Sequence, residues 1–317
     1  MAKRPEQPAQ DRSRVLRKVM KRTGIGLGSL ALVVVLAVLV VYAASEARFR
    51  RAYDEVAVSP LRAVATPATL ERGRHLATAI AKCADCHGGD MGGRLFIDAG
   101  PLGQVYASNL TAGRGGAMRR YSDGQLERAI RHGIDADGHA LAIMPSNDYW
   151  AMSDADLQDL IAYLRTLPPV DRQVPRTTIR ALGRGLYLAG KLPLFPAELM
   201  SHTARRPEPV QPGVTLEYGK YLATIGGCTG CHGPDLAGAA AGHGPDEPPP
   251  ANLTPRGELR TWTEQDFFNA LRTGKRPNGS AIRAPMPWAA SGQMTDDEIR
   301  AVWMFIRSMP AKPTPTE

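Results

Sequence analysis

The chain has 317 residues, a formal net charge of +8 and four cysteines. Its length is enough for two domains. Residues 1–24 hold eight Lys or Arg against two acidic residues, a net of +6 that leaves +2 for the rest of the chain. The basic composition is therefore local to the N-terminus, and it does not indicate a nucleic-acid-binding surface.

An uncharged apolar stretch follows the basic tail, from Ile25 to Ala44 (IGLGSLALVVVLAVLVVYAA). About 20 apolar residues are enough to cross a bilayer as a helix. The basic residues before it place the N-terminus in the cytoplasm by the positive-inside rule. We therefore predict a cytoplasmic tail over 1–24, a transmembrane anchor over 25–44 and a linker over 45–65. The alternative is a signal peptide cleaved near Ala44, and either interpretation exports the rest of the chain.

The remaining sequence contains one unit twice, at an offset of about 145 residues. LERGRHLATAIAKCADCHGGDMGG from Leu70 matches LEYGKYLATIGGCTGCHGPDLAG from Leu216, and SNLTAG from Ser108 matches ANLTPR from Ala251. We predict domains over 66–170 and 211–317. The stretch between them, 171–210, is interpreted as a linker with one helix packed on a domain. A helix on the membrane surface or in contact with a partner is the alternative for its apolar part, ALGRGLYLAGKLPLF.

Both units are predicted to be all-α, with short helices joined by long loops. Capping patterns mark four helix starts and two glycines suit helix ends. These positions are Ser122, Ser153, Thr263 and Thr295 for the starts, and Gly133 and Gly274 for the ends. No alternating pattern long enough for a strand is found. Loops this long need something else to organise them.

Each unit carries the motif Cys-x-x-Cys-His, as CADCH and as CTGCH. A disulfide inside such a pair would close a very small loop and constrain little. Zinc needs four ligands, usually within a few tens of residues, whereas these pairs are far apart in sequence. A thioredoxin-type pair needs a βαβ context, which is missing. The pattern therefore predicts two covalently attached c-type haems, which would also organise the loops. The attaching residues are Cys83, Cys86, Cys228 and Cys231.

The histidine that ends each motif is predicted to be the proximal iron ligand, because one helical turn carries it to the iron. These residues are His87 and His232. On the opposite side we favour Met144 and Met286, which stand in Met-Pro pairs 57 and 54 residues after the respective histidine. Ligation of this kind raises the reduction potential above that of two histidines.

A second histidine in place of each methionine stays open as an alternative. Its candidates are His132 or His139 in the first unit and His243 in the second. Four further residues at matching positions are candidates for the haem pockets: Tyr121 and Trp262, and Asn109 and Asn252. For the aromatic pair, packing in the core competes with a hydrogen bond to a haem propionate. For the asparagines, a glycosylation site competes with a polar position in the pocket.

These motifs resemble those of membrane-anchored dihaem cytochromes c built from class I domains. The resemblance rests on the lead-ins at Gly73 and Gly219, both Cys-x-x-Cys-His motifs, both NLT segments and MSDADLQDLIAYLRTLPPV from Met152. It is closest to the cytochrome c subunits of bacterial periplasmic dehydrogenases for alcohols, aldehydes, sugar acids and N-heterocycles. Those subunits usually have three haem domains, whereas two are found here. The resemblance implies that an N-terminal helix crosses a C-terminal helix in each domain, with haem between them.

The predicted function is electron transfer on the periplasmic face of the bacterial inner membrane. Two haems would pass single electrons from a periplasmic dehydrogenase to the respiratory chain. The alternative is a subunit or donor of a terminal oxidase. A dihaem peroxidase is a third interpretation, but it needs an iron with an open position, and the matching Met144 and Met286 argue against that.

Overall fold

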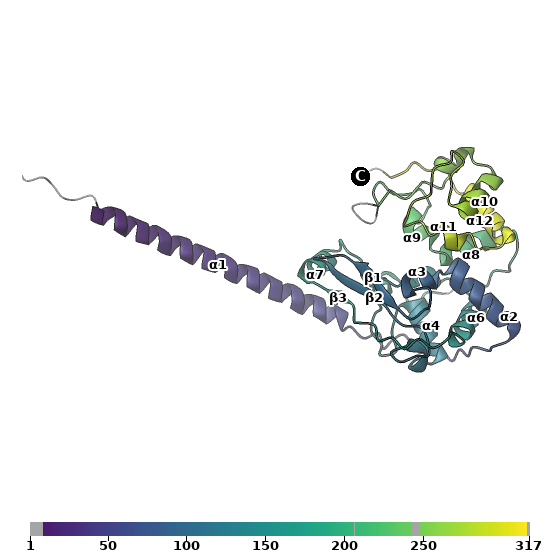
Figure 1. Cartoon of the computed structure of the whole chain (residues 1–317), viewed down its shortest axis with the longest axis horizontal. Coiled ribbons are helices and arrows are strands. Elements are labelled where there is room, and N and C mark those ends of the chain that lie inside the picture. The colour runs from purple at the N-terminus through teal and green to yellow at the C-terminus, as the bar shows by residue number, and fades with distance from the viewer. Residues whose placement is uncertain (1–8, 206, 243–246, 316–317) are drawn as a thin grey trace, which may run out of the picture.

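The computed structural model describes residues 9–205, 207–242 and 247–315. A long helix, α1 (Ala9–Phe49), projects from a body in which two helical units lie side by side (Figure 1). The segment from Arg14 to Phe49 has a mean hydropathy of 2.8 in its most apolar window, and none of that window is buried in the protein. By length and composition this helix can cross a membrane, and it contains the predicted anchor. Residues 1–8 of the predicted tail lie outside the described residues.

The first unit contains mostly short helices: α2 (Pro67–His75), η1 (Leu76–Ile80), α3 (Cys83–His87), η2 (Ala117–Arg119), α4 (Asp123–His132), α5 (Ser146–Tyr149) and α6 (Asp154–Arg165). The second repeats this order as α8 (Leu216–Ile225), α9 (Cys228–His232), η4 (Glu258–Thr261), α10 (Glu264–Thr273), α11 (Trp288–Ser291) and α12 (Asp296–Ser308). The largely helical composition confirms the predicted fold class.

The sequence has no alternating pattern long enough to predict a strand, but three short strands occur in the described residues. The first unit has an antiparallel hairpin of β1 (Arg94–Asp98) and β2 (Gly103–Ala107), and β3 (Thr178–Ile179) adds to β2. Each hairpin strand has only five residues, and the register shifts between Leu95 and Ile97. A run this short and irregular gives almost no period-two signal.

The predicted helix signals are confirmed. The side chains of Ser122, Ser153, Thr263 and Thr295 each accept a hydrogen bond from a backbone N–H in the first turn. Gly133 and Gly274 end their helices in the left-handed conformation, with φ of 66° and 68°. Met152 and Met294, directly before two of these caps, are buried in the core. These caps fix where each helix starts and stops.

In each unit the first helix crosses the last one at a glycine. A Cβ added to Gly73 in α2 would lie 2.0 Å from the carbonyl oxygen of Asp159 in α6. A Cβ on Gly219 in α8 would lie 1.9 Å from the carbonyl oxygen of Ala301 in α12. Only glycine lets the two backbones approach so closely. This crossing is the one that the family resemblance implied.

A π-helical turn absorbs the length difference between the two lead-in helices. Gly73 and Gly219 are 146 positions apart, but Cys83 and Cys228 are 145 apart, so the first unit has one extra residue. In η1 the N–H of Ala81 donates to the carbonyl of Leu76, five residues earlier, at 2.7 Å. A π turn accommodates one added residue without ending the helix. The cysteine motif therefore leaves both helices in the same way.

The two units pack through matching positions. The carboxylate of Asp156 accepts from Arg72 of its own unit at 2.9 Å and from the Tyr221 hydroxyl of the other unit at 2.6 Å. The matching carboxylate, Glu298, lies 3.3 Å from the Tyr218 hydroxyl of its own unit and 2.6 Å from His75 Nε2 of the other.

Arg72 and Tyr218 are equivalent positions of the repeat, as are His75 and Tyr221. Helix α5 contacts α8 just as its counterpart α11 contacts η1. Each unit therefore presents the same face to the other, as subunits do in a two-fold dimer. One contact breaks this symmetry. Arg72 bonds directly to Glu298 of the other unit at 3.1 Å, but no matching bond between Tyr218 and Asp156 is found among the described contacts.

We predict that Gly73→Ala and Gly219→Ala each destabilise the protein by about 2 kcal/mol or more, because the added Cβ forces two packed backbones apart. Thermal unfolding of the purified protein measures this. Gly185→Ala is the matched control, because no atom lies within 4 Å of a Cβ added at that helical position. Equal melting temperatures for all three variants would contradict the account of the crossing.

Acid is predicted to weaken the interface between the units. Burial alone would raise the pKa of Glu298, but hydrogen bonds from His75 and the Thr295 N–H and the charge of Arg72 hold that pKa at about 2. The carboxylate therefore stabilises the fold above its ordinary pKa near 4.5, by about 3 kcal/mol, and this is lost as the pH falls from there toward 2. Denaturant unfolding from pH 6 to 3 should show this loss, and Glu298→Gln should flatten it. An unchanged slope in the variant would contradict the assignment.

Candidate haem attachment sites

Each Cys-x-x-Cys-His motif forms a short helix of its own. Helix α3 begins after Lys82 and α9 after Gly227, and both of these residues are left-handed, with φ of 51° and 69°. The cysteines of each motif thus lie one turn apart, and the histidine follows the second cysteine on the same turn. All four cysteines are unbonded. This arrangement presents two thiols and one imidazole together.

Both motif histidines are oriented by the same backbone contact. Nδ1 of His87 lies 2.6 Å from the carbonyl oxygen of Ser108, and Nδ1 of His232 lies 2.7 Å from that of Ala251. A carbonyl only accepts, so the proton is on Nδ1 and Nε2 is in the form that ligates a metal. Burial also lowers the pKa of His87, which favours the neutral ring. A histidine held in this way is suited to bind iron.

The two predicted methionines occupy equivalent turns. The carbonyl of Met144 accepts from the N–H of Ser146 at 2.8 Å, and that of Met286 accepts from Trp288 at 2.9 Å. Each Met-Pro pair leads into a four-residue helix, α5 or α11. Both side chains are partly buried and pack on the same core as Cys83 and Cys228. Their role as iron ligands stays a prediction.

The histidines of the alternative ligand set have other surroundings. Nδ1 of His132 lies 3.0 Å from Nδ1 of His202, a residue that the sequence did not single out. His139 lies 3.9 Å from Asp135 at the surface. His243 lies outside the described residues. Neither of these two histidines has a histidine at the equivalent position of the second unit.

Asn109 braces a loop behind the first histidine, and Asn252 does so behind the second. The Asn109 amide donates to the carbonyl of Val170 at 2.7 Å, and its oxygen accepts from Thr111. The Asn252 amide donates to the carbonyl of Lys312 at 2.8 Å, and its oxygen accepts from Thr254.

These asparagines directly follow the carbonyls that orient His87 and His232, so they position the histidines through the backbone. Both are buried, with 1% and 6% of their surface exposed, which argues against glycosylation. Contact with haem stays a prediction for them and for Tyr121 and Trp262. Both aromatic residues are half-buried and pack on the core, and burial raises the pKa of Tyr121.

Two residues near the motifs were not singled out by the sequence. The Lys82 ammonium donates to the carbonyl of Ile80 at 2.9 Å and to that of Gly226 in the other unit at 2.6 Å. Asp148 is buried. Its carboxylate lies close to Gly227 of the other unit, because a Cβ added there would be 3.4 Å away. Burial raises the pKa of Asp148 to about 6, although Lys82 opposes this. Lys82 directly precedes the first motif and Gly226 stands two residues before the second, so the two attachment helices begin close together. No sequence pattern predicts this contact, because Lys82 and Gly226 are 144 positions apart.

The donor set fits haem better than the alternatives. In the described part of the chain, no three His, Cys, Asp or Glu residues are grouped so that they could hold a metal ion. Burial raises the pKa of the Cys83 thiol to about 12 and that of Cys86 to about 11. A catalytic thiol pair has a lowered pKa instead. Two thiols and an oriented histidine on one turn are what covalent haem attachment uses.

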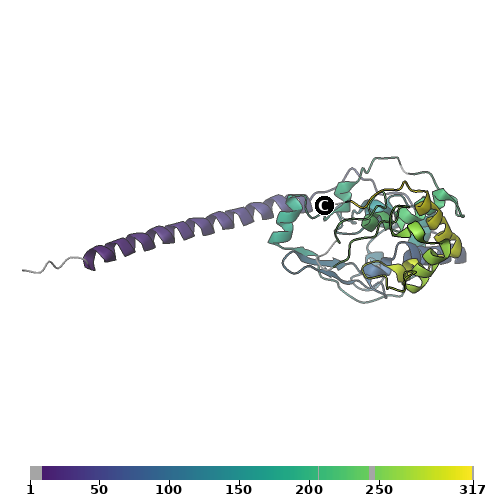
Figure 2. The ribbon, with the colours of Figure 1, turned by 90° about the horizontal axis from the view of Figure 1, so that it is seen from above.

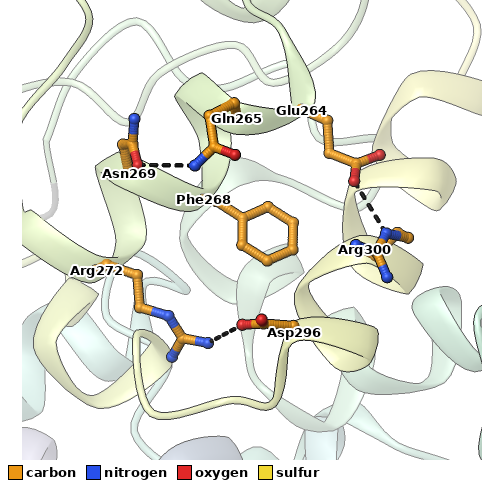
Figure 3. A pocket seen from close by; sticks show the side chains of 7 residues that line it. All are labelled: Glu264, Gln265, Phe268, Asn269, Arg272, Asp296 and Arg300. Carbon is orange, nitrogen blue, oxygen red and sulfur yellow. Dashed lines mark hydrogen bonds and ion pairs between the residues drawn. The ribbon is translucent and has the colours of Figure 1, made fainter.

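The hollow drawn in Figure 3 is a different feature. It has a volume of about 310 Å³ and lies between α10 and α12. Its charged side chains pair with one another, Glu264 with Arg300 at 2.9 Å and Arg272 with Asp296 at 2.7 Å. The residues that line it lie outside the cysteine motifs, so we assign it no part in haem binding.

In comparisons with known proteins, each unit matches the model of one protein family. Residues 216–310 match the family described as "Cytochrome c". Residues 68–164 match the family described as "Cytochrome C oxidase, cbb3-type, subunit III".

Curated relatives extend this result. The chain is 31% identical over 281 residues to the "Fructose dehydrogenase cytochrome subunit" of Gluconobacter japonicus, covering 80% of this chain and 55% of the relative. It is 28% identical over 287 residues to the "Gluconate 2-dehydrogenase cytochrome c subunit" of Pantoea cypripedii, covering 78% and 61%. A "Diheme cytochrome c-type" of Cereibacter sphaeroides is 26% identical over 254 residues, covering 72% and 82%. The chain thus spans somewhat more than half the length of each of the two dehydrogenase subunits.

We predict that Met144→Ala and Met286→Ala each change the visible spectrum of one haem and lower its reduction potential by on the order of 0.1 V, because methionine ligation raises the potential. Spectra and potentiometric titrations of the purified protein measure this. Met152→Ala and Met294→Ala are the matched controls, since these methionines are core residues. The ligand assignment would be wrong if Met144→Ala and Met286→Ala left both haems unchanged.

Proposed function

We propose that this chain carries single electrons away from a dehydrogenase. The chain belongs to the cytochromes c, with one cytochrome c domain in each repeat. The observation that carries this proposal is the pair of equivalent attachment sites held next to each other across the interface. Cytochrome c domains bind haem covalently, and we propose one haem for each of the two domains. When bound, haem supplies an iron that takes up and releases one electron.

The residues of the chain determine how each haem is held. The four motif cysteines would form the thioether bonds, and His87 and His232 would bind the iron through Nε2. Ser108 and Ala251 keep these rings in place through their carbonyls. Met144 and Met286 would supply the second protein ligand of each iron. A haem held by both ligands would exchange single electrons and would not bind a substrate.

The interface between the domains supports electron transfer within the molecule. Lys82 directly precedes Cys83, and its side chain donates to the carbonyl of Gly226, two residues before Cys228. The backbone of Lys82 is left-handed, and the equivalent left-handed residue in the other domain is a glycine, Gly227. A left-handed lysine costs about 1 to 2 kcal/mol, and the bond to Gly226 offsets this cost. The two attachment helices are thereby fixed relative to each other.

The dehydrogenase partner is proposed from the relatives, whose names include cytochrome subunits of fructose and gluconate dehydrogenases. We propose that α1 anchors the chain in the bacterial inner membrane, with its basic end in the cytoplasm and both domains in the periplasm. Electrons would then pass on to the respiratory chain. The second candidate is a subunit or donor of a terminal oxidase, because residues 68–164 match an oxidase subunit family.

The test is purification of the full chain through a C-terminal tag in mild detergent, followed by mass spectrometry of the proteins that remain bound. We expect a dehydrogenase with a flavin, molybdenum or quinone cofactor, and its substrate should reduce both haems of the complex. The double variant His87→Ala and His232→Ala is the control, which should keep the partner but lose the reduction. Oxidase subunits in place of a dehydrogenase would favour the second candidate. Rapid turnover of peroxide by the pure protein would contradict both.

A further inference from the structure

Helix α7 (Ala181–Leu188) is fixed to the end of α1 that leaves the apolar stretch. The Arg184 guanidinium donates to Ser45 Oγ at 2.8 Å and to Glu46 at 3.0 Å. It also lies 4.5 Å from the ring centres of both Tyr42 and Phe49. Figures 1 and 2 both show α7 beside the C-terminal end of α1. The part of the predicted linker 171–210 that forms α7 is therefore packed against α1.

Aromatic residues hold α7 in this position. The ring of Phe49 in α1 lies 5.5 Å from that of Tyr187 and 5.2 Å from that of Phe195. Tyr187 is buried, and its hydroxyl donates to Glu198 at 2.6 Å. These contacts fix which face of α7 points away from the protein.

The outward face of α7 carries no charge. Leu182, Gly185, Leu186 and Ala189 follow one another at helical spacing, and Leu182 is 54% exposed. A Cβ added at Gly185 would meet no atom within 4 Å, so the described part of the protein leaves this face uncovered. The one charged residue in the sequence of α7, Arg184, is turned inward to α1. A helix with an exposed, uncharged face beside a membrane-spanning helix suits a membrane boundary.

The position of α7 along α1 identifies what covers its face. The apolar stretch ends at Ala44, and Arg184 binds at the next residue, Ser45. About 20 helical residues span the hydrocarbon layer, so α7 lies at the level where that layer ends. Lys191, three residues after the end of α7, is exposed and suits anionic headgroups. A protein partner would leave this coincidence of level unexplained.

We propose that α7 lies in the headgroup region of the membrane that α1 crosses, with Leu182 and Leu186 in contact with anionic phospholipid. This inference rests on the proposed anchoring by α1. A single helix leaves the domains free to swing, whereas a second contact at α7 fixes how they are tilted. It would thereby hold the two attachment sites in one orientation toward membrane-bound partners.

The test uses a nitroxide spin label on Leu182→Cys in the full-length, haem-loaded protein, reconstituted in vesicles of phosphatidylcholine with phosphatidylglycerol. The native cysteines are blocked by their bonds to haem. Relaxation by oxygen, which concentrates in lipid, is compared with relaxation by a water-soluble nickel chelate. Val35→Cys in α1 is the lipid control, and Leu216→Cys, 42% exposed in α8, is the water control.

We expect the ratio of oxygen to nickel relaxation at position 182 to be several-fold higher than at position 216 and lower than at position 35, which lies deeper in the lipid. A ratio at 182 that equals the one at 216, with 35 in lipid, overturns the proposal and leaves the anchor standing. A label at 182 shielded from both reagents also overturns it, because protein would then cover the face. Water-like ratios at both 35 and 182 overturn this inference together with the proposed anchor.

Discussion

The buried carboxylate of Glu298 is the interaction on which the arrangement of the two domains depends. It accepts from Tyr218 of its own domain and contacts Arg72 and His75 of the other. A buried carboxylate is costly unless its partners are all present. Since those partners come from both domains, separating the domains would leave the charge without them. The matching contacts of Asp156 make the interface nearly two-fold.

This symmetry determines where the haem sites lie. Both attachment helices follow the helices that form the interface, so each is carried toward the other domain. Lys82 then bonds directly to Gly226. The close helix crossings at Gly73 and Gly219 fix the first and last helices of each domain against each other. The fold would therefore be a rigid support for the two proposed haems, and α7 and α1 would set its orientation at a membrane.

Local patterns in the sequence were sufficient for much of this. Capping residues such as Ser122 act within one turn, so their signal is local and was interpreted correctly. The repeat revealed the equivalence of both cysteine motifs. The hairpin β1–β2 was missed because its strands are too short for a clear period. The interface could not be predicted, because equivalent positions such as Arg72 and Tyr218 carry different side chains. Contacts such as Lys82 with Gly226 depend on how the domains pack.

The central claim is that the two domains form one unit through which electrons pass internally. It is tested most directly by flash reduction of a small fraction of the haem in the pure protein, followed at wavelengths where the two haems differ. The account predicts that the electron redistributes between the haems at a rate that does not change with protein concentration. A redistribution rate proportional to protein concentration would contradict it, because electrons would then pass only between molecules.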